Sequence, residues 1–97
     1  MPRPRIMRLV GRMPQDVCFK PAGIKMRDLT EVILTVEESE AIRLKDFKSL
    51  SQEACAKKMG ISQPTFHRLI LIARQKAADA IINGKALKIE GGNFKKY

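Results

Sequence analysis

The sequence has few of the residues that build cofactor sites and disulfide frameworks. Cysteine occurs only at Cys18 and Cys55, histidine occurs once, and tryptophan is absent. Two distant cysteines outside a C-x-x-C spacing, with one histidine, predict neither a disulfide framework nor a zinc site. We therefore expect no metal and no cofactor, and we interpret Cys55 as a small core residue on a buried helix face.

Long hydrophobic runs are also missing. No apolar run approaches the length that crosses a bilayer, and the arginine-rich start lacks the apolar stretch of a signal peptide. This predicts a cytoplasmic protein without a membrane partner. The chain also lacks a nucleophile–base pair, a glycine-rich phosphate loop and a metal cluster, so we do not expect an enzyme.

Positive charge is abundant and unevenly placed. The 97 residues suffice for one domain, and they carry a net charge of +9 with a pI of about 10.0. The net charge is +6 over residues 1–27, −2 over residues 28–61 and +5 over residues 62–97. A merely solubilising surface would not segregate charge in this way, so the pattern favours a polyanionic partner.

Residues 1–28 are expected to form a basic arm and an irregular loop. Prolines hold the start extended, and the arm is either a disordered tail or a segment that reaches a phosphate backbone or minor groove. A short stretch at 17–19 can form one strand. The arm residues expected to contact DNA are Arg3, Arg5, Arg8 and Arg12.

Residues 29–84 are expected to hold three helices. Thr35 and Glu38 form a capping box that predicts a helix over 36–46, with Ala41, Leu44 and Phe47 facing inward. Ser51 and Ser62 are expected to cap the second and third helices, which end at Gly60 and at Asn83–Gly84. Pro64 fits the first turn of the third helix, since a missing N–H costs little there.

Residues 85–97 are expected to form a short strand and a tail. The alternation over Ala86–Glu90 predicts the strand, and Asn93–Tyr97 is expected to fray. A lone strand must satisfy its backbone groups elsewhere, and the stretch at 17–19, in the same chain or in a second subunit, is the candidate partner.

The spacing of small and apolar residues in 51–74 predicts a helix-turn-helix. Ala56 allows two helices to cross closely, and Gly60, four positions later, tolerates the positive φ that the turn requires. Apolar residues occupy the flanking buried positions, namely Cys55, Met59, Ile61, Phe66 and Leu69. The predicted fold is mainly α, a three-helix helix-turn-helix domain with an irregular N-terminal arm and a short C-terminal strand.

The outward side of the third helix carries residue types that read bases. Arginine can contact guanine with two hydrogen bonds, glutamine suits adenine, and threonine or leucine can meet a thymine methyl group. The expected base contacts are Gln63, Pro64, Thr65, His67, Arg68 and Leu71. The expected phosphate contacts are Ser51, Gln52, Ser62, Arg74 and Gln75.

The third helix has two apolar faces. The inward face is expected to comprise Phe66, Leu69, Ile70, Ala73, Ala77, Ala80 and Ile81. A second apolar stripe would remain exposed to solvent in an isolated three-helix unit. It comprises Leu71, Ala78 and Ile82. The N-terminal loop, the terminal strand or a second subunit should cover it, and the two-fold symmetry common among DNA readers favours a homodimer.

Two segments resemble a known DNA-reading domain. The stretches L-T-V-E-E-S-E-A-I-R-L from Leu34 and L-S-Q-E-A-C-A-K-K-M-G-I-S-Q-P-T-F from Leu50 resemble region four of bacterial sigma factors, in which a helix-turn-helix reads a promoter element. This resemblance covers about half of the chain. It implies a helix-turn-helix of the winged-helix-like superfamily, and the chain lacks the region that would make it a complete sigma factor.

A second resemblance covers nearly the whole chain. The motifs R-P-R at 3–5, F-K-P-A-G at 19–23, E-A-I-R-L-K-D at 40–46 and G-K-A-L-K-I-E-G-G at 84–92 are similar to those of a family of small, uncharacterised predicted DNA-binding proteins. The resemblance implies the same helix-turn-helix and leaves the biological role open.

We therefore expect sequence-specific binding of double-stranded DNA and a role in transcriptional regulation. The alternative is an adaptor that binds RNA polymerase or a ribonucleoprotein through the sigma-like surface. The acidic middle of the chain would then supply the contact, unless it is an ordinary solvated face. Its residues are Glu37, Glu38, Glu40 and Asp46.

Overall fold

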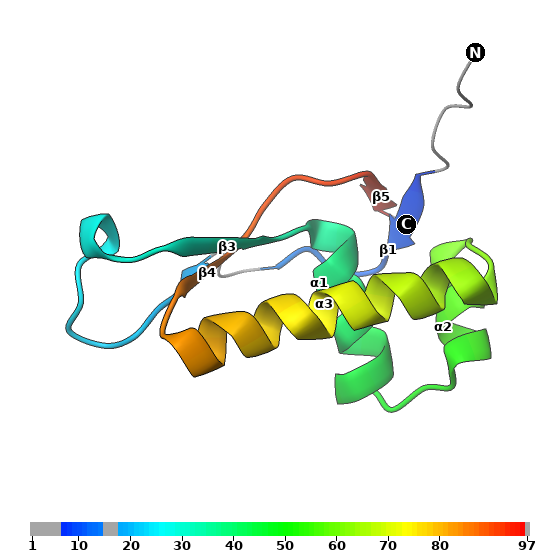
Figure 1. The fold of residues 1–97 in the computed structure, drawn as a ribbon. Coiled ribbons are helices and arrows are strands. Elements are labelled where there is room, and N and C mark those ends of the chain that lie inside the picture. The colour runs from blue at the N-terminus through cyan, green and yellow to red at the C-terminus, as the bar shows by residue number, and fades with distance from the viewer. Residues whose placement is uncertain (1–6, 15–17, 97) are drawn as a thin grey trace, which may run out of the picture.

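A single long helix spans the molecule and holds its two parts together. The computed structural model describes residues 7–14 and 18–96. In it, α3 (Gln63–Asn83) packs against α1 (Val36–Ile42) and α2 (Gln52–Met59) near its start and against a small sheet near its end (Figure 1). The described part is thus a small domain of three helices with some strands.

The sheet beside the end of α3 contains three strands in the order β2-β4-β3. β4 (Ala86–Ile89) pairs antiparallel with β2 (Cys18–Phe19) and parallel with β3 (Glu31–Leu34). The predicted pairing of 17–19 with the C-terminal strand is confirmed within the chain for Cys18 and Phe19, and Val17 lies outside the described residues. The turn η1 (Met26–Asp28) connects β2 to β3.

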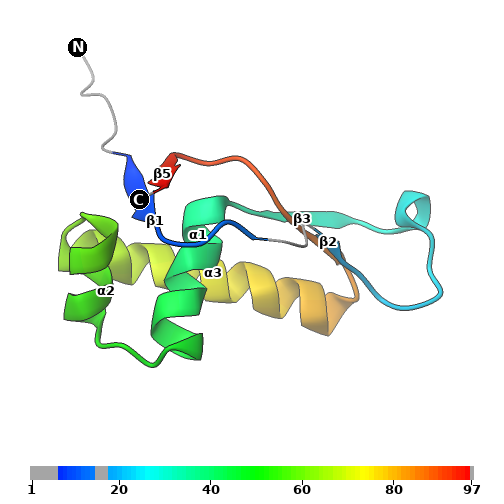
Figure 2. The same cartoon turned by 180° about the vertical axis from the view of Figure 1, so that it is seen from behind.

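A second, two-stranded sheet corrects two expectations about the chain ends. β1 (Arg8–Val10) pairs parallel with β5 (Phe94–Lys96), close to α1 and α2 (Figure 2). The prediction of an irregular arm is therefore wrong for residues 8–10, and the prediction of a frayed tail is wrong for residues 94–96. The physical reason is Val10, which is completely buried and anchors β1 so that β5 can pair with it.

The helix ends follow the predicted caps. Thr35 accepts a hydrogen bond from the backbone N–H of Glu38 at 3.2 Å, and the Glu38 carboxylate accepts from the N–H of Thr35 at 2.8 Å. Ser51 and Ser62 cap α2 and α3 as predicted, and Gly60 and Gly84 end these helices in the left-handed conformation.

The first helix ends earlier than predicted. The α-helix ends at Ile42, with the N–H of Arg43 donating to the carbonyls of Ser39 and Glu40. A π-helical turn, η2 (Arg43–Phe47), follows, in which the N–H of Lys48 donates to the carbonyl of Arg43 at 2.8 Å. The wider turn rotates the following side chains away from the 3.6-residue period. Phe47 is consequently 75% exposed, so the prediction that it faces inward is wrong.

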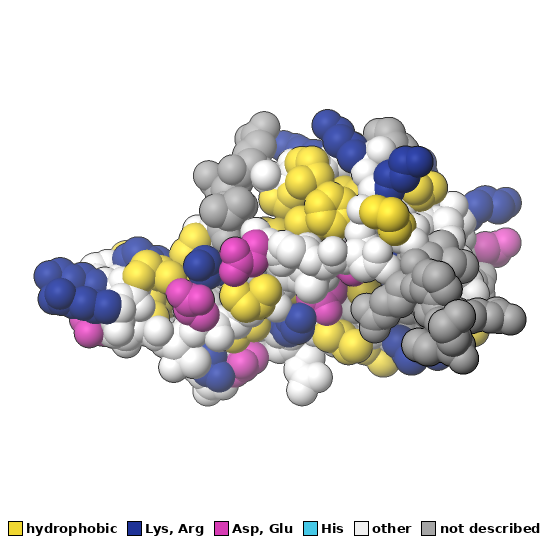
Figure 3. Space-filling view, turned by 90° about the horizontal axis from the view of Figure 1, so that it is seen from above, with side chains coloured by type: hydrophobic (Ala, Val, Ile, Leu, Met, Phe, Trp, Pro, Cys, Tyr) yellow, Lys and Arg dark blue, Asp and Glu magenta, His cyan; other side chains and the backbone are white. Residues whose placement is uncertain are grey.

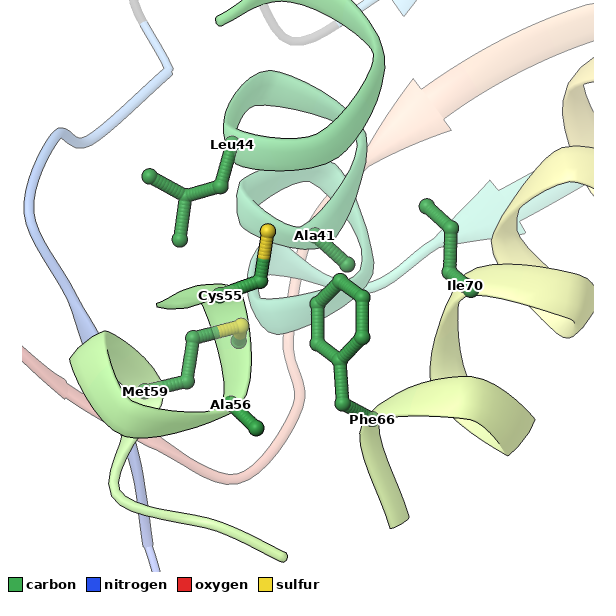
Figure 4. Close-up of a cluster of buried hydrophobic side chains, with 7 residues drawn as sticks. All are labelled: Ala41, Leu44, Cys55, Ala56, Met59, Phe66 and Ile70. Carbon is green, nitrogen blue, oxygen red and sulfur yellow. The ribbon is translucent and has the colours of Figure 1, made fainter. Parts of the chain in front are cut away.

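The main core lies where the three helices meet (Figure 4). Cys55 and Phe66 are completely buried there, as predicted, and burial raises the pKa of the Cys55 thiol. Ile81 is 78% exposed, so its predicted inward position is wrong. At that end of α3 the sheet covers only the side that carries Ala80. The core side chains are Ala41, Leu44, Cys55, Ala56, Met59, Phe66 and Ile70.

The face that carries the strands bears charges of both signs. Figure 3 shows lysine and arginine side chains towards both ends of this face, and hydrophobic side chains in the region of β1 and β5. Among the described residues, no helix is both long and apolar enough to span a membrane.

Candidate functional site

The start of α3 and the start of α2 lie together at one end of the molecule, joined by a tight turn. Gly60 has φ of 67° and ψ of 33°, and the N–H of Ile61 donates to the carbonyl of Ala56 at 3.0 Å. Ala56 is 3% exposed, so its small side chain allows the close approach of the two helices. This turn fixes the angle at which α3 leaves α2.

Polar side chains on the first turns of α3 are linked in a short chain of hydrogen bonds. The hydroxyl of Ser62 accepts from the N–H of Thr65 at 3.2 Å and donates to the Thr65 hydroxyl at 2.9 Å. Arg68 donates from Nη2 to the same hydroxyl at 3.3 Å. These contacts hold the guanidinium of Arg68 along the exposed side of α3.

A side-chain contact also connects α3 to the start of α2. Nε2 of Gln52 and Nδ1 of His67 lie 3.3 Å apart. The amide N–H donates when this ring nitrogen is unprotonated. Gln52 is half-buried and His67 is exposed, so the contact orients a glutamine and a histidine on the same open surface.

The predicted base-contact residues share one solvent-facing side of α3. All are exposed except Thr65, which is half-buried. They lie within the first nine positions of the helix, counting from its first residue to Leu71. The structure therefore brings together Gln63, Pro64, Thr65, His67, Arg68 and Leu71.

The predicted phosphate contacts differ in whether their side chains are exposed or already paired within the fold. Ser51 and Ser62 are exposed at their helix starts, where backbone N–H groups are available to an anion. Arg74, in contrast, donates two hydrogen bonds to Asp46, at 2.6 and 3.1 Å. These hydrogen bonds lower the pKa of Asp46 and raise that of Arg74. Gln75 is exposed further along α3, beside Ala78.

The N-terminal arginines are divided between two environments. Arg3 and Arg5 lie outside the described residues. Arg8 belongs to β1, where its N–H donates to the carbonyl of Asn93 at 3.1 Å, and its side chain is half-buried. Arg12 follows β1 and is exposed. Residues 8–10 themselves form a strand and not a free basic arm.

A basic hollow beside α2 was missed by the sequence reasoning. It has a volume of about 400 Å³ and brings together the cationic side chains of Arg43, Lys48 and Lys58. These residues belong to η2, to the loop after it and to the last turn of α2. No local pattern groups them, and the packing of η2 against α2 places them around one hollow.

The acidic middle of the chain is not a solvated face. Glu37, Glu38 and Glu40 are 5, 6 and 1% exposed, so the expectation of an acidic contact surface is wrong for these three. Each finds polar partners inside the fold: the N–H of Asn93 for Glu37, Lys76 for Glu38, and Arg43 with the N–H of Gly11 for Glu40.

No metal centre is assembled in the part of the chain that the structure describes. No group of three or more histidine, cysteine, aspartate or glutamate side chains lies close enough to hold an ion there. Cys18 is half-buried and Cys55 is buried, and both are free thiols.

The comparisons with known proteins agree on one family. A family model described as "Protein of unknown function DUF134" matches residues 1–97. The chain is 59% identical over 97 residues to a UPF0251 protein of Caldanaerobacter subterraneus subsp. tengcongensis, covering 100% of this chain and 82% of that protein.

Other relatives are nearly as similar. A UPF0251 protein of Thermoanaerobacter pseudethanolicus is 58% identical, with 100% of this chain and 82% of that protein covered. One of Pelotomaculum thermopropionicum is 57% identical, with 98% and 72% covered. No solved structure matches the chain. The chain therefore belongs to the DUF134 family, whose curated relatives carry the name UPF0251.

Proposed function

We propose that this protein binds double-stranded DNA in a sequence-specific manner through α2 and α3, acting as a helix-turn-helix of the kind found in sigma region four, and that it regulates transcription. In this proposal α3 enters the major groove with its first turns, and the start of α2 meets the phosphate backbone. Such a protein would work in the cytoplasm, where bacterial DNA lies.

The observation that carries the proposal is the ordered polar surface at the start of α3. Arg68 is held by Thr65, and His67 is held by Gln52 across the turn, at 3.3 Å in each case. Side chains that are already oriented lose less entropy on binding a base than free ones do. A helical hairpin that served only the core would not require this exposed polar network.

The electrostatics support the same partner. The net charge of +9 favours a polyanion, and the exposed starts of α2 and α3 offer free N–H groups to phosphates. The basic hollow beside α2 adds the exposed cationic groups of Lys48 and Lys58, while the Arg43 guanidinium there is paired with Glu40.

The adaptor alternative loses the surface on which it relied. Three of its four acidic residues are buried, and the fourth, Asp46, is engaged by Arg74. A polymerase contact would have to use other residues, and no feature of the described chain singles them out.

Selection of bound duplexes from a random pool tests the proposal directly. Enrichment of one sequence is expected, and affinity for the selected duplex should fall steeply with salt because cationic side chains displace counterions from phosphates. An unenriched pool, together with recovery of RNA polymerase in the absence of DNA, would favour the adaptor instead.

Arg68→Ala is the sharpest single test of the assigned face. On the selected duplex it should cost about 1–3 kcal/mol of binding free energy, because a bidentate contact to a base would be lost. Arg27→Ala is the matched control: it removes the same charge from an exposed position on η1, far from the start of α3 (Figure 1). Equal losses in the two variants would show that Arg68 contributes only its charge.

A further inference from the structure

One apolar stripe of α3 remains uncovered by every described element. It comprises Leu71, Ala78 and Ile82, with the polar Gln75 on the same line, and all four are exposed, Leu71 at 49% and Ile82 at 78%. Of the three alternatives for its cover, the terminal strand pairs with β2 and β3 and the described part of the N-terminal segment pairs with β5 and β4, which leaves a second subunit. Two further exposed side chains flank the stripe: Ile72 at 48% and Ile81 at 78%.

The spacing of the stripe is that of a helix-pairing seam. Successive members lie four, three and four residues apart, which is the alternation that keeps side chains on one line in a coiled coil. A straight surface of this kind fits another helix better than it fits a compact small molecule.

The stripe is also symmetric about its own midpoint, between Lys76 and Ala77. Leu71 and Ile82 are equidistant from this point, as are Gln75 and Ala78, and the same holds for Ile72 and Ile81. A two-fold axis through the midpoint would therefore place each leucine against an isoleucine, and each glutamine against a small alanine. Such self-complementarity is what a two-fold interface requires.

The charges beside the stripe do not oppose such pairing. Arg74 is paired with Asp46 at 2.6 Å, Lys76 with Glu38 at 2.7 Å, and Asp79 with Lys85 at 3.0 Å. Each ion pair neutralises a flanking residue within its own chain. Arg68, three residues before Leu71, donates to the neutral Thr65 hydroxyl and keeps its charge at the end of the seam, so two copies with a net charge of +9 meet their nearest like charges at the seam ends and not at its centre.

We propose that α3 pairs antiparallel with α3 of a second copy of this chain through this stripe, with Leu71 of each copy against Ile82 of the other. The stripe spans 11 residue steps, or about 17 Å at 1.5 Å per residue. An interface of that length is small, so the dimer is weak and forms at high protein concentration.

The pairing reassigns two residues of the sequence-based DNA face. Leu71 and Gln75 contact the second copy, and the part of α3 that faces DNA is confined to residues 63–68. The pairing does not depend on DNA binding, and it is tested without DNA, so that failure of one proposal is distinguishable from failure of the other.

Sedimentation of the full chain over a range of concentrations gives the first test. The wild type should pass from monomer to dimer, and Leu71→Glu or Ile82→Glu should each weaken the dimer by about 100-fold or more, since each change places two charges in the seam per dimer. Phe47→Glu is the control, because Phe47, at 75%, is about as exposed as Ile82 and lies off the stripe. Circular dichroism verifies that each variant is folded.

The double variant Leu71→Lys/Ile82→Glu tests the register. The two positions lie about three turns apart on one helix and cannot meet within a chain, whereas each lysine meets a glutamate of the other copy in the proposed pair. It should recover about 10-fold or more of the affinity lost in the single variants. A wild type that stays monomeric, a dimer unaffected by the single changes, or a double variant no better than the singles would overturn the proposal.

Discussion

The buried glutamates of α1 show how single residues tie distant segments to one helix. Glu40, 1% exposed, accepts hydrogen bonds from Arg43 at 2.7 and 2.8 Å and from the N–H of Gly11 at 2.7 Å. Glu37 accepts from the N–H of Asn93 at 2.9 Å. Buried carboxylates are tolerated only when hydrogen-bonded or ion-paired, so these contacts fix both chain ends on α1.

Gly92→Ala tests the closest of these approaches. Gly92 has φ of 109°, and a methyl group there would collide with the Glu37 carboxylate and with Cβ of Thr35. We expect a loss of about 2–4 kcal/mol in the free energy of unfolding, from backbone strain and overpacking together. Denaturant unfolding measures it.

Gly91→Ala separates the two causes. Gly91 has φ of 69° but open space around its Cβ position, so only backbone strain of about 1 kcal/mol is expected. Equal losses at the two glycines would show that contact with Glu37 contributes nothing.

At the scale of elements, η2 and α3 are joined by one exposed ion pair. Arg74 and Asp46 have side chains 43 and 39% exposed, and their atoms approach to 2.6 Å. Because solvent screens such a pair, it contributes little to stability, although it holds the guanidinium at Asp46. The same pair explains why α3 can present a neutral flank to a second copy.

Asp46→Asn should reveal this pair through its pH dependence. The pKa of Asp46 lies below the ordinary 3.8 in the folded protein, because Arg74 donates hydrogen bonds to it. Its contribution is therefore complete above the unfolded pKa and is lost as the pH falls through the folded pKa. At pH 7 the variant should be less stable by under about 1 kcal/mol, after allowance for solvent screening.

Unfolding at acidic pH is compared with unfolding at pH 7 for the wild type and for Asp46→Asn. Once both states are protonated, wild type and Asp46→Asn should unfold alike, because the carboxylate no longer differs from the amide in charge. Asp28→Asn removes a carboxylate from an exposed position on η1 and serves as the control for loss of the charge itself. A stability difference for Asp46→Asn that persists unchanged at low pH would contradict the assignment.

At the scale of the whole molecule, the C-terminal segment ties the strands to the helices. After β4, the carbonyl of Gly91 accepts from the N–H of Val36 at 3.1 Å, and β5 then pairs with β1. The chain thus crosses from the sheet at the end of α3 to the helices at its start (Figures 1 and 2). The two parts of the molecule are therefore coupled by this crossing as well as by α3.

Removal of residues 91–97 should destabilise the entire domain. It deletes the hydrogen bonds of Val36, Arg8 and Glu37 to this segment, each contributing about 1 kcal/mol, so a loss of about 3 kcal/mol is expected. Lys95→Ala, which removes an exposed side chain and keeps the backbone, should leave the thermal midpoint unchanged. A truncated protein as stable as the full chain would show that β5 contributes nothing to the stability of the domain.

Local chemistry allowed the sequence by itself to determine the three helices and their caps. A Thr35 capping box, a serine before each later helix and a glycine after it act within a few residues of chain, so they can be identified without knowing the fold. The inward side of α3 near Phe66 follows from the 3.6-residue period for the same reason.

Only the tertiary structure decided how the chain ends pair, which acidic residues are buried and which apolar side chains stay exposed. β1 and β5 are separated by more than 80 residues, and Glu37 and Glu40 are buried only because those ends return to α1. The turn η2 exposes Phe47, and the small sheet leaves Ile81 uncovered. These outcomes depend on contacts between residues far apart in sequence, and neither periodicity nor local propensity contains that information.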